Sequence, residues 1–221
     1  FHRKDYAGFR HPEMPDSRME QFVQETDSVT GLFDRFADAV KSEAGAAYFL
    51  EKTPEHALRL SYLIEHFPRS IFVFLVRDPR DGLRSAKNFP GYWATLPEED
   101  RTGGYLETWR ESVEAYEAYA DMSSVVLIRY EDFCRRPHEE TCHILETIGL
   151  EIEPHQLDPS AYGEGHSEKP DAHARLREPI TPKSIGTWRE ELSEDDVRRV
   201  ERILGEKMRY FDYSPEHVDV S

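Results

Sequence analysis

The chain has 221 residues, with 28 Lys and Arg against 44 Asp and Glu, so its formal charge at pH 7 is −16. A hydrophobic content of 38% excludes disorder throughout, and the acidity argues against nucleic acid as a partner, because nucleic-acid binding requires clustered cations. The longest apolar run, residues 71–76, is far shorter than the roughly 20 residues of a membrane-spanning helix, so no membrane segment is expected.

The first part of the chain predicts helices and one short strand. Residues 1–27 are polar and contain breakers, which indicates loop and short helix. Apolar residues then recur at helical spacing from residue 29 until about Gly45. Residues 47–51 predict a short strand. The sequence 53–55, Thr-Pro-Glu, predicts that the next helix begins with a cap, a first-turn proline and an early carboxylate.

The middle of the chain predicts a parallel strand followed by a capped helix. Residues 71–76 form a continuous apolar run between prolines, which is typical of a strand buried on both faces of a sheet. Asp78 is placed to cap the next helix, which starts at Pro79 and carries Asp81 in its first turn. The apolar pattern then predicts a helix over residues 106–120.

The remaining elements complete an α/β pattern. Residues 125–128 predict a second buried strand, and the helix that starts at Pro137 is expected to end at Gly149. Residues 153–186 hold five prolines and three glycines without periodicity, which indicates a functional loop or lid. Ser193 predicts the start of the last helix.

Strands that alternate with helices predict a parallel sheet with flanking helices in three layers. One domain over residues 1–221 is expected. Its parts are an N-terminal helical segment (1–46), an α/β core (47–150), a long loop or lid (151–189) and a C-terminal helix (190–221).

Charged residues follow the second predicted strand, at the edge of the sheet where ligands of open parallel sheets bind. Arg77 stands at the strand tip, and Asp78, Gly82 and Ser85 share one stripe of the following helix. Because Gly82 has no side chain, we expect room beside the Ser85 hydroxyl. Arg77, the first-turn amides and Ser85 would then converge on a phosphate. The alternative is an ordinary strand-turn-helix, in which Arg77 pairs with a carboxylate.

Two positive islands stand out in the acidic chain. Residues 77–87 hold four cations and two anions, and residues 175–189 hold four cations and one anion. Their pairing indicates one anionic ligand held from two sides, although islands of this size also arise by chance.

These residues resemble the sulfotransferases that use 3′-phosphoadenosine 5′-phosphosulfate (PAPS), in their bacterial and tyrosylprotein-type branches. Four blocks between about residues 47 and 213 carry the resemblance in the family's order: 51–56, 74–85, 127–133 and 183–189. The resemblance implies a P-loop-NTPase-like sulfotransferase fold. It also implies transfer of a sulfonate from PAPS, the co-substrate, to a hydroxyl or amine acceptor.

For the nucleotide, the resemblance implies that Arg77 and Ser85 bind the 3′-phosphate of PAPS and that Tyr130 lies beside the adenine. A core tyrosine that closes a strand is the alternative role of Tyr130. The late loop would close on the same phosphate, and its matching residues are Lys183, Ser184 and Gly186.

For catalysis, the resemblance implies that Lys52 stabilises the charge at the sulfonate. Glu51 is the candidate general base, and orientation of Lys52 through an ion pair is its alternative role. Transfer between two oxygens depends on positioning and charge neutralisation, so no metal is expected. The residues Cys134, His138, Cys142 and His143 have a zinc-like spacing, but Pro137 starts a helix between them.

The family's first strand and its Gly/Ser/Thr-rich phosphosulfate loop have no counterpart before Glu51. For this reason, and because the sequence starts at Phe1 without Met, we expect an N-terminally incomplete chain. We also expect its activity to be impaired. A non-catalytic 3′-phosphoadenosine-binding remnant and a P-loop nucleotide kinase relative are the alternative functions. The two cysteines suit a reducing compartment, so a cytoplasmic protein is expected. The acceptor is left open between a small molecule, a glycan and a peptide, and the oligomeric state is left open too.

Overall fold

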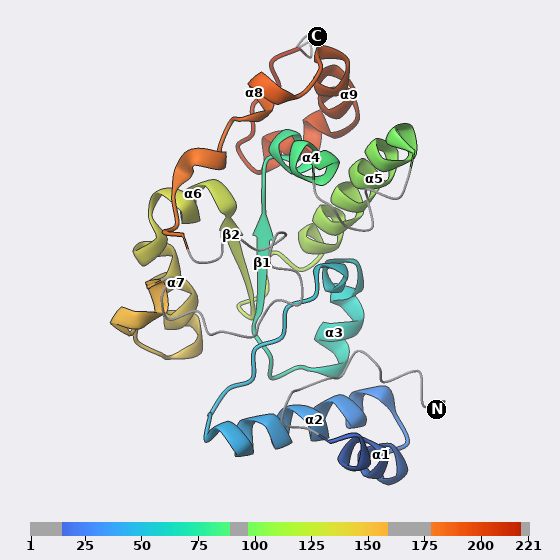
Figure 1. Cartoon of the computed structure of the whole chain (residues 1–221), viewed down its shortest axis with the longest axis vertical. Helices are drawn as coiled ribbons and strands as arrows, with labels where there is room; N and C mark the ends of the chain where they lie inside the picture. The colour runs from blue at the N-terminus through green and yellow to red at the C-terminus, as the bar shows by residue number, and fades with distance from the viewer. Residues whose placement is uncertain (1–14, 89–96, 159–177, 218–221) are drawn as a thin grey trace. The chain divides into compact units, whose positions relative to one another are not determined.

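The computed structural model describes residues 15–88, 97–158 and 178–217 (Figure 1). The chain divides into two compact units, Phe1–His56 and Ala57–Ser221, which are described separately below. Helices together with a pair of parallel strands confirm the predicted α/β class. The single domain and its boundaries at residues 46, 150 and 189 stay predictions.

The described part of the first unit contains the α-helices α1 (Asp16–Glu25) and α2 (Val29–Ala44). The Ser28 hydroxyl accepts a hydrogen bond from the Gly31 amide at 3.0 Å and so caps the start of α2. Gly45 ends α2 in the left-handed conformation, with a φ of 61°, which favours glycine. The two helices contribute a small apolar cluster of Met19, Phe22, Leu32, Phe36 and Ala39. The predicted amphipathic helix is confirmed.

The strand predicted over residues 47–51 is wrong, because this segment has no regular secondary structure. A strand requires a hydrogen-bonded neighbour, and residues 15–56 contain no other strand that could supply one. Two of its apolar side chains are instead open to solvent, with Tyr48 55% and Leu50 89% exposed, while Phe49 packs against the apolar cluster of α1 and α2.

The helix predicted from residue 53 begins as a 3₁₀ turn, η1 (Pro54–Arg59), and continues as α3 (Leu60–His66). The Thr53 hydroxyl does not cap it. It donates instead to the Glu51 carboxylate at 2.5 Å. The apolar pattern therefore located the helix correctly, but its first turns are tighter than an α-helix.

A parallel pair of strands organises the second unit: β1 (Phe72–Val76) and β2 (Val125–Arg129) (Figure 1). Val76 pairs with Arg129, so both strands end at the same edge. The described residues supply two strands to this sheet. Both strands were predicted, and their parallel pairing agrees with the expected fold class.

The helices of the second unit after α3 are α4 (Pro79–Asn88), α5 (Glu98–Glu117), α6 (Tyr130–Arg135), α7 (Pro137–Ile148), α8 (Trp188–Glu191) and α9 (Glu194–Tyr210). Two further 3₁₀ turns are η3 (Pro154–Leu157) and η6 (Pro182–Ser184). The four longer helices were predicted. The short α6 and α8 were not, because they lack a repeat of apolar spacing. Much of the predicted lid, residues 159–177, lies outside the described residues.

The two faces of β1 differ in their environment. Phe72, Phe74 and Val76 join the main apolar core, to which α5 and α9 contribute most of the other side chains. On the opposite face Val73 is 42% and Leu75 56% exposed. The predicted burial of this strand on both faces is therefore wrong. The described helices on this side, α6 and α7, contact β2 instead.

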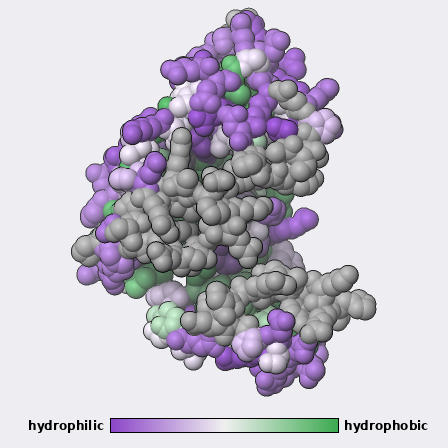
Figure 2. Space-filling model, viewed as in Figure 1, coloured by the Kyte–Doolittle hydropathy of each residue, from purple (hydrophilic) through white to green (hydrophobic). Residues whose placement is uncertain are grey.

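The outer surface over α8 and α9 is mostly hydrophilic (Figure 2). Buried residues of α9, such as Val200, Leu204 and Met208, face the core, as expected for an amphipathic surface helix. None of the helices in the described ranges is both long enough and apolar enough to cross a membrane.

Candidate functional site

The predicted phosphate site lies at the turn from β1 into α4. The Asp78 carboxylate accepts a hydrogen bond from the Arg80 amide at 2.9 Å, which caps α4 as predicted. The Asp78 amide donates to the buried Glu131 carboxylate at 3.0 Å. The Trp109 indole donates to the Arg77 carbonyl at 3.0 Å. Side chains from α5 and α6 thus hold the strand tip in addition to its own cap.

Arg77 contacts uncharged groups. Its Nη2 donates to the Ser184 carbonyl at 3.0 Å, and its Cζ lies 4.4 Å from the centre of the Tyr130 ring. Among the described residues it forms no ion pair, and its buried Nε has no hydrogen-bond partner there. The alternative interpretation expected Arg77 to pair with a carboxylate. No such pair is found among the described residues.

Tyr130 and Ser184 complete this contact. Their hydroxyl oxygens are 2.8 Å apart, within hydrogen-bond distance. Burial raises the pKa of the Tyr130 phenol, while the hydrogen bond to Ser184 opposes this rise. The phenol is therefore protonated at neutral pH. Through Arg77 and Ser184, the structure brings the two positive islands of the sequence into contact.

Asp81 binds the late loop to α4, which sequence reasoning missed. Its Oδ2 accepts the Gly186 amide at 2.6 Å. Its Oδ1 accepts the Trp188 amide at 3.0 Å and the Thr187 hydroxyl at 3.2 Å. Gly186 has a φ of 77°, in the left-handed region that favours glycine. The sequence placed Asp81 only in the first turn of its own helix, and no local pattern reveals a partner more than a hundred residues away.

Two other predicted residues stand apart from the Arg77 contacts. Ser85 is half-buried and lies one helical turn after Asp81, on the same side of α4. Its hydroxyl has no hydrogen bond to a described residue. Lys183 is exposed and makes no ion pair within the described ranges. Neither side chain thus has a polar partner among the described residues.

The room expected over Gly82 is occupied. A β-carbon at Gly82 would lie 1.7 Å from the Tyr105 hydroxyl, so this phenol fills the gap left by the missing side chain. Burial raises the pKa of Tyr105, against the opposing effect of the nearby Arg77 charge. Sequence reasoning missed this residue. Its spacing of four from Trp109 on the same helix was the available signal.

Arg80 is the centre of a buried ionic network beside the site. Its Nε and Nη2 bind the two carboxylate oxygens of Asp78 at 3.0 and 2.7 Å, and its Nη1 binds Glu201 at 2.6 Å. Burial lowers the pKa of Arg80, but hydrogen bonds and charges of both acids outweigh it and raise the pKa overall. The guanidinium also lies 4.1 Å from the Trp188 ring centre, so the same network supports α8.

The candidate catalytic residues belong to the first unit. The Glu51 carboxylate accepts the Thr53 hydroxyl and lies 2.7 Å from His56 Nδ1. Its partners among the described residues are Thr53 and His56, and no ion pair with Lys52 is found there. The side chains of both Glu51 and Lys52 reach solvent.

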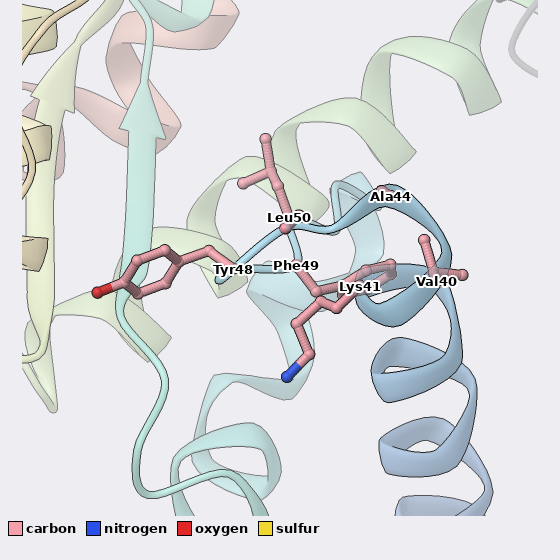
Figure 3. A pocket seen from close by; sticks show the side chains of 7 residues that line it. Val40, Lys41, Ala44, Tyr48, Phe49 and Leu50 are labelled. Carbon is pink, nitrogen blue, oxygen red and sulfur yellow. The ribbon is translucent and has the colours of Figure 1, made fainter.

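A small open cavity of about 280 Å³ lies in the same unit, between the end of α2 and the segment after it (Figure 3). Its lining residues are Val40, Lys41, Ala44, Ala46, Tyr48, Phe49 and Leu50. The walls are largely apolar. The Lys41 ammonium at its edge is 2.8 Å from the Asp38 carboxylate, so the cavity offers no unpaired charge from this lysine.

The zinc-like spacing around α7 produces a contact of two residues. Cys142 Sγ lies 3.7 Å from His138 Nδ1, and Cys134 is buried elsewhere as a free thiol. Groups of three or more potential metal ligands are not found in the part of the chain that the structure describes.

Comparisons with known proteins place the chain in a family. The model of the sulfotransferase family matches residues 2–154. Sulfotransferase 2A6 and sulfotransferase 2A1 of Rattus norvegicus are 24% and 25% identical over 147 residues, which is 59% of this chain and 51% of each relative. The chain thus spans about half the length of the curated relatives it matches. A solved sulfotransferase domain from the curacin biosynthetic pathway shares the fold, with a TM-score of 0.64 at 15% identity over 92% of this chain and 77% of that chain.

Proposed function

Because this chain belongs to the sulfotransferase family, we propose that it transfers a sulfonate group from PAPS to a hydroxyl or amine acceptor. The observation that carries this proposal is the Arg77 guanidinium, which lies on Tyr130 at the tip of β1 without an acidic partner among the described residues. Such a guanidinium keeps donors for an anion of matching geometry. The 3′-phosphate of PAPS is an anion of this kind.

In the proposed complex, groups from both positive islands bind the 3′-phosphate. Arg77 supplies a forked donor, and Ser85 supplies a hydroxyl from α4. Lys183 and the Gly186 segment approach from the late loop. Tyr130 orients Arg77 and Ser184 with its ring and hydroxyl and lies beside the adenine. This assignment is supported by the contacts of Arg77 with Ser184 and Tyr130.

In the proposed reaction, the acceptor oxygen or nitrogen attacks the sulfur of PAPS. The bond from sulfur to the bridging oxygen of the 5′-phosphate breaks, and adenosine 3′,5′-diphosphate leaves. Glu51 accepts the acceptor's proton, and the Lys52 ammonium stabilises the negative charge at the sulfonate during transfer. Contacts with His56 and Thr53 hold the Glu51 carboxylate in one orientation. These catalytic roles rest on the family resemblance.

The setting of the reaction is part of the same proposal. Cys134 and Cys142 are unpaired thiols, which supports a reducing compartment such as the cytoplasm. The acceptor is a small molecule, a glycan or a peptide, and the charge of −16 speaks against nucleic acid.

Isothermal titration of the whole chain with adenosine 3′,5′-diphosphate and with AMP tests the nucleotide assignment. We expect at least about tenfold preference for the diphosphate, because a phosphate bound by charge-assisted hydrogen bonds contributes more than 1.4 kcal/mol. Arg77→Ala is expected to weaken diphosphate binding about 10- to 100-fold. Arg198→Ala removes an equal charge from the exposed side of α9 and serves as the control.

An unchanged affinity of Arg77→Ala for the diphosphate would contradict the site. A preference for ATP with Mg²⁺ would favour the nucleotide kinase alternative. Transfer of labelled sulfonate from PAPS to a panel of hydroxyl and amine acceptors then separates an enzyme from a non-catalytic nucleotide-binding protein. Nucleotide binding without sulfonate transfer to any acceptor of the panel would support the non-catalytic alternative.

A further inference from the structure

Asp81 is an acid in an unusual position. It is one of the most buried charged residues, with 1% exposure, and its carboxylate forms no ion pair within the described residues. The hydrogen bonds seen for its carboxylate come from the late loop, through the amides of Gly186 and Trp188 and the hydroxyl of Thr187. A buried carboxylate is costly unless it is hydrogen-bonded, so these three donors account for its presence.

The loop residues that Asp81 holds adjoin the contact to Arg77. Ser184 receives the Arg77 guanidinium on its carbonyl and reaches Tyr130 with its hydroxyl. Two residues later, Gly186 is bound to Asp81 at 2.6 Å. The path of the chain from Lys183 to Trp188 is therefore held at both ends, by Arg77 at one side and by Asp81 at the other.

We infer that Asp81 is a positioning residue for the 3′-phosphate, which holds the late loop so that Lys183 and Ser184 approach the same anion as Arg77. This inference rests on the proposed function. Asp81 does not touch the nucleotide in this assignment. It acts through the loop, and its effect is specific to the 3′-phosphate, because the loop it holds approaches only that part of the ligand.

Electrostatics and positioning predict opposite signs for the neutral variant. A negative charge near a phosphate opposes phosphate binding, so removal of the charge alone would strengthen binding. If Asp81 acts by holding the loop, Asp81→Asn weakens binding instead. The reason is geometric: one side-chain oxygen can still accept from Trp188, but the new amide group must face the Gly186 amide, donor against donor. The loop is then released at Gly186.

The test is titration of the whole chain with adenosine 3′,5′-diphosphate and with AMP, in the wild type and three variants. Asp81→Asn is expected to bind the diphosphate about tenfold more weakly and AMP within about twofold of the wild type. Thr187→Val removes one hydrogen bond to Asp81 and keeps its charge, and it is expected to lose about two- to fivefold for the diphosphate alone.

Glu191→Gln is the matched control, because it removes one negative charge from an exposed residue of α8 that binds Arg84. Its diphosphate affinity should stay at the wild-type value. If Asp81→Asn folds poorly in a thermal melt, Thr187→Val decides the question. Equal or tighter diphosphate binding by either folded variant overturns the inference, and so does an equal loss for AMP. A wild type that does not distinguish the diphosphate from AMP overturns the proposed function itself.

Discussion

Two arginines three residues apart, Arg77 and Arg80, have very different surroundings at the turn from β1 into α4. Arg80 is 3% exposed and lies between the carboxylates of Asp78 and Glu201. Arg77 meets an aromatic ring and a carbonyl, without a described acid in reach. A buried cation with two acids is satisfied by the protein, whereas a cation without one is free to bind an anionic ligand. The comparison separates Arg80, whose partners are supplied by the fold, from Arg77, for which we propose a role in binding.

The strongest test of this difference is to replace each arginine by methionine in a separate variant and to compare the stabilities of the two proteins. Arg80→Met is expected to lower the free energy of unfolding by about 3–5 kcal/mol, because it leaves buried carboxylates without compensation. Arg77→Met should cost less than about 1 kcal/mol, because no buried acid loses its partner. Urea denaturation measures both values. Equal losses would mean that Arg77 also serves the fold.

A second test addresses the packing of Gly82 against Tyr105. Gly82→Ala is expected to cost about 1–3 kcal/mol of unfolding free energy, because the new methyl group collides with the Tyr105 hydroxyl. A double-mutant cycle with Tyr105→Ala should show strong coupling between the two positions. Gly103→Ala is the control, since the nearest atom to its added carbon is the end of the Arg199 side chain at 3.6 Å. A Gly82→Ala protein as stable as the wild type would refute the close packing.

The smallest effect is expected at Tyr130, the aromatic partner of Arg77. Tyr130→Phe keeps the ring under Arg77 and removes the hydroxyl that bonds Ser184, so diphosphate affinity should fall about two- to tenfold. Titration measures the change. Tyr210→Phe, at an exposed position of α9, should bind as the wild type does. An unchanged affinity in Tyr130→Phe would show that the stacked ring alone orients Arg77.

The turn itself could be predicted from the sequence because its signals are local. An apolar run bounded by prolines, followed by Asp78 and Pro79, specifies a strand tip and a capped helix. The partners of Asp81 and Gly82 could not be predicted in this way. They lie on the late loop and on α5, and single-sequence spacing carries no information about which distant segment packs against a given side chain.

Two of the three strand predictions illustrate the same limit. Residues 47–51 and 71–76 both have strand-like composition, but only the second has a hydrogen-bonding neighbour, β2. Backbone pairing decides whether an extended segment becomes a strand, and pairing is a long-range property. Burial is long-range too, which is why the apolar run at 71–76 could not reveal that Val73 and Leu75 are exposed.

Glu201, one of the two acids that pair with Arg80, also binds the segment that follows α9. Glu201 accepts the amides of Glu216 and His217 at 2.9 and 2.7 Å, while Arg80 donates to the Ser214 carbonyl at 3.1 Å. Loose ends of a fold usually fray at almost no free-energy cost. Here, fraying would have to open the ionic network of Arg80 and Glu201, so these amides should exchange their protons with deuterium about as slowly as those at the tip of β1.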